Sequence, residues 1–225
     1  QTSSISLYQE SADTKSYVLD GLEAFYDAIN NTGSGHSSSA KVWKDLSGKQ
    51  HDLIYQGEGE VTWNDKAYDF IHPETNYFET TDTIALGNTA RTIEIVCSIE
   101  EDGVENLVGI GTQNANTLND IIYYNNGMNI NTYGNQANEG MENKSFEKGR
   151  TYITTITYDN TKHIANYYTN LQAKEQVNFQ TLNTASSTLT VGKGKDSTHN
   201  KNKRFKLQAL RIYNRILTEE ERLTN

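Results

Sequence analysis

Tyrosine and asparagine side chains alternate along one stretch of the sequence in a way that could bind a sugar. Such a site needs aromatic faces that stack on pyranose rings, and amides or carboxylates that hold the hydroxyl groups. Alternate residues of a strand share a face, so Asn129, Asn131 and Tyr133 are expected on one side. Because tyrosine is also common inside sheets, one of Tyr123 and Tyr124 is expected to face the core. The candidate ligand-binding residues are Tyr123, Tyr124, Asn126, Asn129, Asn131 and Tyr133.

Oxygen-bearing side chains gather at two other places, where they could hold calcium. This ion takes about six to eight oxygen ligands, often from Asp, Asn and backbone carbonyls in loops. The candidates are Asp27 with Asn30 and Asn31, and Asp196 in a late loop. No Asp-x-Asp-x-Asp-Gly run accompanies them, and Asn-rich loops are often plain turns. Calcium is therefore the cofactor that these residues could hold, with an ordinary turn as the alternative.

Other reactive residues lack the spacing that catalysis requires. The five histidines include no pair at metal-ligand spacing. The segment 33–36 lacks the pattern of a nucleophile elbow, and the segment 192–196 lacks that of a phosphate-binding loop. We therefore expect flexible loops there and no enzyme, while a site assembled only in three dimensions stays open.

Composition limits the partners and the folding class. With 20 Lys and Arg against 29 Asp and Glu, the formal net charge is -9, which argues against a nucleic-acid partner. The single cysteine, Cys97, excludes an intrachain disulfide and is expected to be a small buried hydrophobe. No apolar run is long enough for a transmembrane helix, so membrane insertion is not expected. The chain starts without Met and without a signal peptide, which is typical of a mature product or a fragment of a larger protein.

Short alternating segments rich in Ile, Val, Thr and Tyr are the elements that must position these residues. Strands are expected at 22–28, 53–56, 67–71, 77–80, 92–99, 107–110, 121–125, 129–133, 152–158, 163–169, 188–191 and 205–213. Short helices are expected in 27–31 and after Thr218, where Glu221 completes a capping box.

About a dozen strands with short loops predict an all-β fold, a two-sheet antiparallel jelly-roll sandwich. Residues 1–17 are expected to form a leading segment or linker, and 18–225 the β-sandwich domain. In the last strand, alternation places Phe205, Leu207, Ala209 and Tyr213 on one face. Both of its faces are partly apolar, which predicts a strand that is covered on both sides.

Both ends of the predicted domain and one strand between them carry a resemblance to a known family. Residues 21–27, followed by 43–48, resemble the opening of laminin-G-like domains in the concanavalin A-like lectin/glucanase superfamily. Residues 205–221 resemble the close of such domains and are the more specific match, and 106–111 fit a middle strand. In the first region, Asp45 is expected to accept backbone N–H groups in a turn, with Trp43 packed beside it.

The resemblance implies a concanavalin A-like sandwich and a function outside the cell. Laminarinase-type relatives carry Glu-x-Asp-x-Glu on one strand, with paired carboxylates that act as nucleophile and acid. Glu94 is the nearest counterpart here, but its same-face neighbours Val96 and Ser98 are not acids. The resemblance therefore implies a non-catalytic, lectin-like or adhesin-like domain that binds a glycan, in a secreted or cell-surface bacterial protein. The alternatives are a domain that binds a host or cell-surface protein or acts as a spacer, and a glycoside hydrolase with an unfamiliar site.

Overall fold

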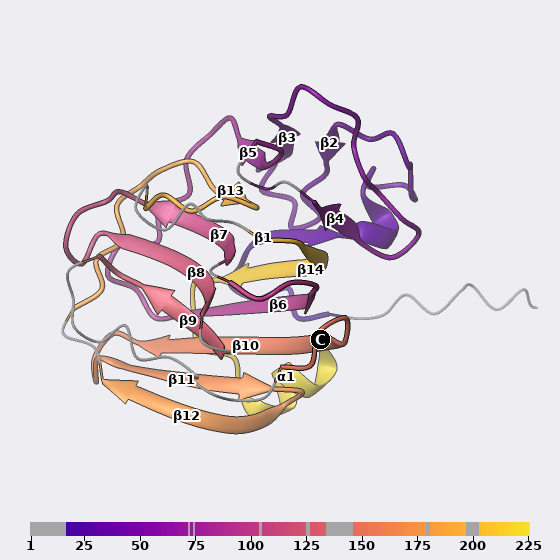
Figure 1. Cartoon of the computed structure of the whole chain (residues 1–225). Coiled ribbons are helices and arrows are strands. Elements are labelled where there is room, and N and C mark those ends of the chain that lie inside the picture. The colour runs from indigo at the N-terminus through magenta and orange to yellow at the C-terminus, as the bar shows by residue number, and fades with distance from the viewer. Residues whose placement is uncertain are drawn as a thin grey trace, which may run out of the picture.

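The structure is a computed structural model that describes residues 17–71, 73, 75–103, 105–124, 127–133, 146–178, 181–196 and 203–225, apart from the side chains of Glu105, Tyr124 and Lys174. The described strands form two seven-stranded sheets that pack face to face (Figure 1). Every strand pairing in this part of the chain is antiparallel. The predicted all-β sandwich is therefore confirmed.

Sheet A has the strand order β1-β14-β6-β10-β11-β12, and β4 also pairs with β14. Its strands are β1 (Leu22–Asp27), β4 (Tyr68–Phe70), β6 (Arg91–Ile99), β10 (Thr151–Asp159), β11 (Ile164–Thr169), β12 (Gln172–Asn178) and β14 (Phe205–Tyr213). Sheet B has the order β2-β3-β5-β13-β7-β8-β9. Its strands are β2 (Val42–Trp43), β3 (Leu53–Tyr55), β5 (Phe78–Thr80), β7 (Glu105–Gly111), β8 (Leu118–Tyr124), β9 (Gly127–Asn131) and β13 (Thr190–Val191).

The core lies between the two sheets. Alternate residues of β6 point into it, among them Ile93, Ile95 and Cys97, and Ile121 of β8 belongs to the same cluster. The Cys97 side chain is buried, as predicted for a small hydrophobe. Trp43 is fully buried in an aromatic group at one end of the core, and its ring centroid lies 4.8 Å from that of Trp63.

Two short helices complete the described structure. The 3-10 helix η1 (Ala28–Asn30) begins at Asp27, whose side chain accepts a hydrogen bond from the Ile29 N–H. The helix α1 (Glu219–Thr224) has the predicted capping box, in which Thr218 and Glu221 exchange side-chain-to-backbone hydrogen bonds. Neither helix in the described ranges is long and apolar enough to cross a membrane.

A β-bulge in β14 changes which residues face the core. The register with β6 shifts between Leu207 and Ala209, so two consecutive residues oppose one on the partner strand. Before the bulge, Leu207 faces the core, whereas beyond it Leu210 takes that direction. Ala209 and Tyr213 therefore lie on the outer face of sheet A, not beside Leu207 as strict alternation predicted.

Two strands were absent from the sequence expectations. β2 has only two residues, too few for a periodic pattern. β12 contains Gln, Lys, Glu and Asn, which are poor strand formers, and it lies at the edge of sheet A. The turn before it uses Asn170 and Leu171, both with positive φ, in place of the glycine that usually marks such a turn.

The expected turn around Asp45 is confirmed. Its carboxylate accepts hydrogen bonds from the backbone N–H groups of Phe25, Ser47 and His51. Gly48 has a φ of 84°, the left-handed conformation that this residue type adopts without strain. The turn lies between β2 and β3 of sheet B, and its hydrogen bond to Phe25 connects it to β1 of sheet A.

Candidate functional site

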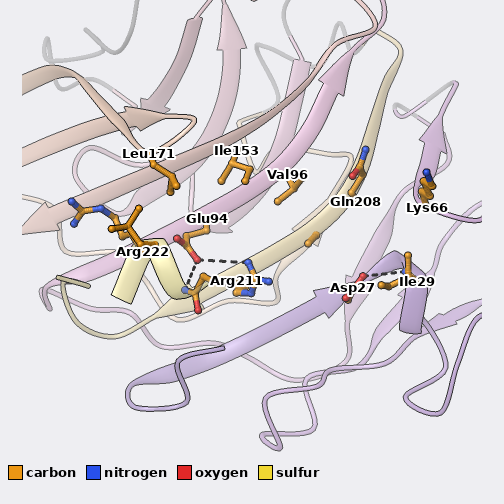
Figure 2. Close-up of a pocket in the computed structure, with 13 residues that line it drawn as sticks. Asp27, Ile29, Lys66, Glu94, Val96, Ile153, Leu171, Gln208, Arg211 and Arg222 are labelled. Atoms are coloured by element: carbon orange, nitrogen blue, oxygen red, sulfur yellow. Dashed lines mark hydrogen bonds and ion pairs between the residues drawn. The ribbon is translucent and has the colours of Figure 1, made fainter. Parts of the chain in front are cut away.

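A groove of about 420 Å³ lies on the outer face of sheet A, away from the core (Figure 2). Its floor comes from β1, β6, β10 and β14, and the end of α1 forms one wall. Sites for small molecules commonly measure about 300 to 1,000 Å³, so the volume suits a small ligand. The lining residues are Asp27, Ile29, Lys66, Glu94, Val96, Ile153, Leu171, Gln208, Ala209, Arg211, Arg222, Leu223 and Asn225.

Strand alternation and the bulge place the floor residues. Glu94 and Val96 point outward because their neighbours Ile93 and Ile95 fill the core. Ala209 and Arg211 pair with Val96 and Glu94 in the ladder between β14 and β6, so they share the outer face. The bulge between Leu207 and Ala209 therefore directs Arg211 into the groove.

The wall is held by contacts of α1 with the sheet. The Arg222 guanidinium lies 4.0 Å from the ring centroid of Tyr168 on β11, a cation–π contact. Its Nη1 also donates to the Leu217 carbonyl. Asn225, at the end of α1, donates from Nδ2 to Glu94 and to the Tyr213 hydroxyl. These contacts fix the wall above the polar end of the floor.

Glu94 is a buried carboxylate at the base of the groove, with 2% of its surface exposed. Burial raises the pKa of this carboxyl group, against the opposing effects of Arg211, Asn225 and Thr155. The distance between Glu94 Oε2 and Asn225 Nδ2 is 2.7 Å, and Glu94 Oε1 lies 3.3 Å from the Thr155 hydroxyl. Arg211 Nη1 lies farther away, at 3.8 Å.

The groove combines polar groups with an apolar floor. Val96, Ile153 and Ala209 offer carbon surface, while Gln208 and Asn225 can donate or accept hydrogen bonds. Asp27 and Glu94 are the two carboxylates of the lining, and β14 runs between their strands. Because neighbouring strands lie about 4.8 Å apart, their backbones are about 10 Å or more apart. The arrangement can bind a ligand, while glycoside hydrolysis would need carboxyl groups about 5 Å apart for retention or about 6.5 to 9.5 Å apart for inversion.

The predicted tyrosines lie elsewhere, on sheet B. Tyr123 is buried in the core, with its ring centroid 5.7 Å from that of Phe146, so it is the inward-facing member of its pair. The backbone of Tyr124 belongs to β8, but its side chain and all of Asn126 lie outside the described residues. Tyr133 follows β9 and is 38% exposed. Ligand contact by these residues stays a prediction.

Asn129 and Asn131 are brought together on the outer face of sheet B, but both are buried. Asn129 donates to the Gly127 carbonyl. Asn131 donates to Asp196 and accepts from the Tyr133 N–H. Their amides therefore hold β9 and the late loop in place.

Asp120 joins the same buried cluster, which the sequence did not indicate. Its carboxylate accepts hydrogen bonds from the backbone N–H groups of Lys195 and Asp196. Burial raises the pKa of Asp120 to about 7, and the charge of Asp196 acts in the same direction. Gly194 fits here because a Cβ at this position would lie 2.7 Å from Asp120 Oδ2.

The calcium candidates are divided between the two sheets. Asp27 caps η1, and the amides of Asn30 and Asn31 hydrogen-bond to the backbone of Gly35 and Ser37. Asp196 is buried on sheet B, where it accepts from Gln113 and Asn131. Within the described ranges, no three His, Cys, Asp or Glu side chains gather where they could hold a metal ion. Calcium stays a prediction.

The fold and its closing segment agree with a comparison to protein families. Residues 72–221 match the laminin G family model described as the concanavalin A-like lectin/glucanases superfamily. The chain belongs to this superfamily. No curated protein matches the chain.

Three solved structures of longer chains are similar to this one in fold. Trypanosoma rangeli sialidase, in complex with 2,3-difluorosialic acid, matches with a TM-score of 0.62 and 17% identity, over 89% of this chain and 32% of that one. The binding domain of Paraclostridial Mosquitocidal Protein 1 matches with a TM-score of 0.66 and 16% identity, over 92% of this chain and 52% of that one. A mutant of HCR/D matches with a TM-score of 0.61 and 14% identity, over 90% of this chain and 50% of that one. The chain thus spans about a third to a half of these structures, and the likeness is one of fold.

Proposed function

We propose that this chain is a non-catalytic binding domain that holds a carbohydrate in the groove on sheet A. The groove itself carries the proposal, because it is large enough for a sugar and joins an apolar floor to amide, carboxylate and guanidinium groups. Membership of a lectin and glucanase superfamily supports a glycan as the ligand. The similarity to the binding domain of a mosquitocidal protein supports a binding role.

The absence of catalysis is part of the same proposal. Glu94 has non-acidic neighbours on its own face, and Asp27 lies two strands away. We expect no release of reducing sugar from laminarin or other β-glucans, and no change in that result for Glu94→Gln. Hydrolysis that is lost in Glu94→Gln would replace this proposal with a glycosidase.

A glycan array, followed by NMR mapping of any ligand found, tests the carbohydrate function. Ile153 and Ile216 offer a matched pair of variants, because they are 36% and 37% exposed and only Ile153 lines the groove. We expect Ile153→Ser to weaken glycan binding at least threefold and Ile216→Ser to leave it unchanged. Equal effects of the two variants on glycan binding, or chemical shifts that change only on sheet B, would show that the binding site lies outside the groove.

Protein binding is the second candidate function, favoured by exposed apolar side chains along the groove. Ile29, Ile153, Leu171 and Leu223 are between 36% and 61% exposed and lie in its lining. Exposed apolar side chains of this kind are typical of surfaces that bind another protein. A domain that binds no glycan on the array but captures a cell-surface protein, with binding reduced by Ile153→Ser, would support this function instead.

Calcium dependence is a separate expectation. An ion that binds only the folded chain raises the melting temperature, by an amount that grows with the ratio of its concentration to its dissociation constant. We would compare melting in 1 mM calcium and in chelator, with Asp27→Asn and Asp196→Asn as the variants. A shift that one variant removes would assign the ion to that residue's loop.

A further inference from the structure

Arg211 stands out in the groove because its guanidinium has few partners of its own. Its side chain is 12% exposed, and Cζ lies 4.7 Å from the ring centroid of Phe25. Among the residues that the structure describes, none hydrogen-bonds to its buried Nε. Its nearest charged group, Glu94, is 3.8 Å away, beyond hydrogen-bond distance. A guanidinium carries five N–H donors in a planar fork, so much of this capacity is unused.

Glu94 does not require Arg211 as its hydrogen-bond donor. Its two oxygens already accept from the Thr155 hydroxyl and from Asn225 Nδ2. Phe25 pairs with Arg211 in the ladder between β1 and β14, and its ring packs against the guanidinium from the side. The Arg211 side chain lines the groove (Figure 2). Its position is thus fixed, and its terminal Nη groups, which donate to no residue in the described part of the chain, remain available to a ligand, whereas Nε is buried.

The charges around Arg211 favour an anion. Lys66 and Arg222 line opposite ends of the groove, so it has three cations against two carboxylates. Lys66 is exposed, and its ammonium group pairs with no acid in the described part of the chain. Because salt screens charges beyond about 8 Å, a bound ligand responds to the groups of the lining more than to the net charge of -9.

We propose that the groove selects sugars that carry a carboxylate, with Arg211 binding that group through two parallel hydrogen bonds. Arginine and carboxylate match in this planar geometry, and such charge-assisted pairs are about twice as strong as neutral hydrogen bonds. The sugar ring then lies on Val96, Ala209 and Ile153, and Lys66 adds a second positive charge near the groove. This inference rests on the proposed carbohydrate function and names the class of sugar.

Two probes that differ only at C6 test the selectivity. Methyl β-D-glucuronide and methyl β-D-glucoside share a ring, but only the first has a carboxylate. We expect the glucuronide to bind about tenfold more tightly in NMR titrations, and the difference to shrink in high salt. Acetate serves as a bare carboxylate, and we expect it to bind at least tenfold more weakly than the glucuronide.

Variants assign the selectivity to the groove. Arg211→Gln should remove the preference for the glucuronide, while Arg211→Lys should keep part of it, because lysine retains the charge but not the fork. Lys66→Gln changes an exposed residue with little risk to folding, and it should reduce the preference about threefold. Lys49→Gln, an exposed lysine outside the groove, should leave it unchanged.

The outcomes separate this inference from the function on which it rests. Equal binding of glucoside and glucuronide, or a preference that survives in folded Arg211→Gln, overturns the inference and leaves the carbohydrate function in place. If Arg211→Gln does not fold, a preference that Lys66→Gln leaves unchanged overturns it likewise. Binding of acetate as tight as that of the glucuronide also overturns it, since the site would then hold any carboxylate. If no glycan binds on the array either, the carbohydrate function fails first and the inference fails with it.

Discussion

Buried charged residues in this sandwich are stabilised by quite different surroundings. Asp120, on the outer face of sheet B, accepts backbone N–H groups from Lys195 and Asp196. Arg91 is 1% exposed and donates to Asn119, Thr184 and the carbonyls of Gly87 and Thr89. Asp120 should therefore make the stability of the fold depend on pH. Arg91 should make it depend on the geometry of a side chain that donates several hydrogen bonds.

Asp120→Asn should change the pH dependence of unfolding. Burial raises the pKa of Asp120 from 3.8 to about 7, with Asp196 and Lys195 as the charged groups that face it. A raised pKa gives stability that is full below about pH 4 and is lost as the pH rises through 7. The free energy of unfolding of the variant should therefore rise relative to that of the wild type between pH 4 and 8, by up to about 4 kcal/mol.

Denaturant unfolding at several pH values measures this difference. Asp65→Asn is the control, because Asp65 is exposed. A difference between Asp120→Asn and wild type that stays constant from pH 4 to 8 would show that Asp120 titrates normally.

Arg91→Lys should destabilise the fold by about 2 kcal/mol or more. Lysine has a single ammonium group that cannot reach all four acceptors, so buried oxygens lose their donors. Arg150→Lys is the control, because the Arg150 side chain is 57% exposed and should tolerate the change within about 0.5 kcal/mol. Chemical denaturation of both variants gives the comparison, and equal losses would contradict the expected role of Arg91.

At the scale of elements, the bulge in β14 determines what the outer face of sheet A displays. Ala209 and Arg211 reach the groove only because the register shifts after Leu207. Without the extra residue, side chains beyond that point would exchange faces. The one extra residue of the bulge therefore decides whether Arg211 lies in the groove or in the core.

Deletion of Gln208 should prevent folding or cost more than about 4 kcal/mol, because it would direct Arg211 inward and Leu210 outward. Gln208→Ala keeps the chain length and removes only a contact with the Thr151 hydroxyl, so it should cost about 0.5 kcal/mol or less. Circular dichroism and thermal melting distinguish the two. A folded deletion variant with normal stability would mean that β14 can slip in register.

Thr218→Ala should lower the free energy of unfolding by about 1 kcal/mol, because it removes the hydroxyl that caps α1. The variant should also weaken glycan binding, since Arg222 and Asn225 of the groove wall depend on this helix. Thr224→Ala, near the other end of α1, is the control for stability and should lie within about 0.5 kcal/mol of wild type. Normal glycan binding by a destabilised Thr218→Ala would show that the wall does not need the cap.

Local sequence signals predicted most of the strands and both helices, and spatial assembly explains what they missed. In the long strands β6, β10 and β14, apolar and polar residues alternate strongly, and the capping box of Thr218 and Glu221 predicts α1. The bulge has no such signal, because both faces of β14 are partly apolar. The groove as a whole has no sequence signal, because its lining comes from segments between residues 27 and 225. Of its acids, Glu94 was considered as a catalytic acid. Asp27 was singled out for calcium and lies at one end of the groove.

Over the whole molecule, the described chain enters and leaves the sandwich at the same corner. The Val18 N–H donates to the side chain of Asn225 at 2.9 Å, and the Tyr213 hydroxyl donates to the Val18 carbonyl. Tyr17 and Val18 pack with Leu22, Phe25 and other residues in a small apolar cluster on sheet A. Residues 18 and 225 are thus neighbours in space.

A circular permutant should therefore fold. A short Gly/Ser linker from Asn225 to Tyr17, with new ends opened between Asp102 and Gly103, interrupts only an exposed turn. We expect near-UV circular dichroism and glycan binding like those of the original order. A second permutant opened between Ile95 and Val96, inside β6, should fail to fold. Failure of both would indicate that the linker cannot join the ends without strain.

The shared corner also affects how the domain would respond to a pulling force. If both ends were attached to other parts of a larger protein, tension would act on β1 and α1 first, at one edge of the outer face. Strands would then peel away one at a time, and their hydrogen bonds would break in sequence and not together. Asn225 belongs to both the corner and the groove wall, so stretching would open the groove before the sandwich separates.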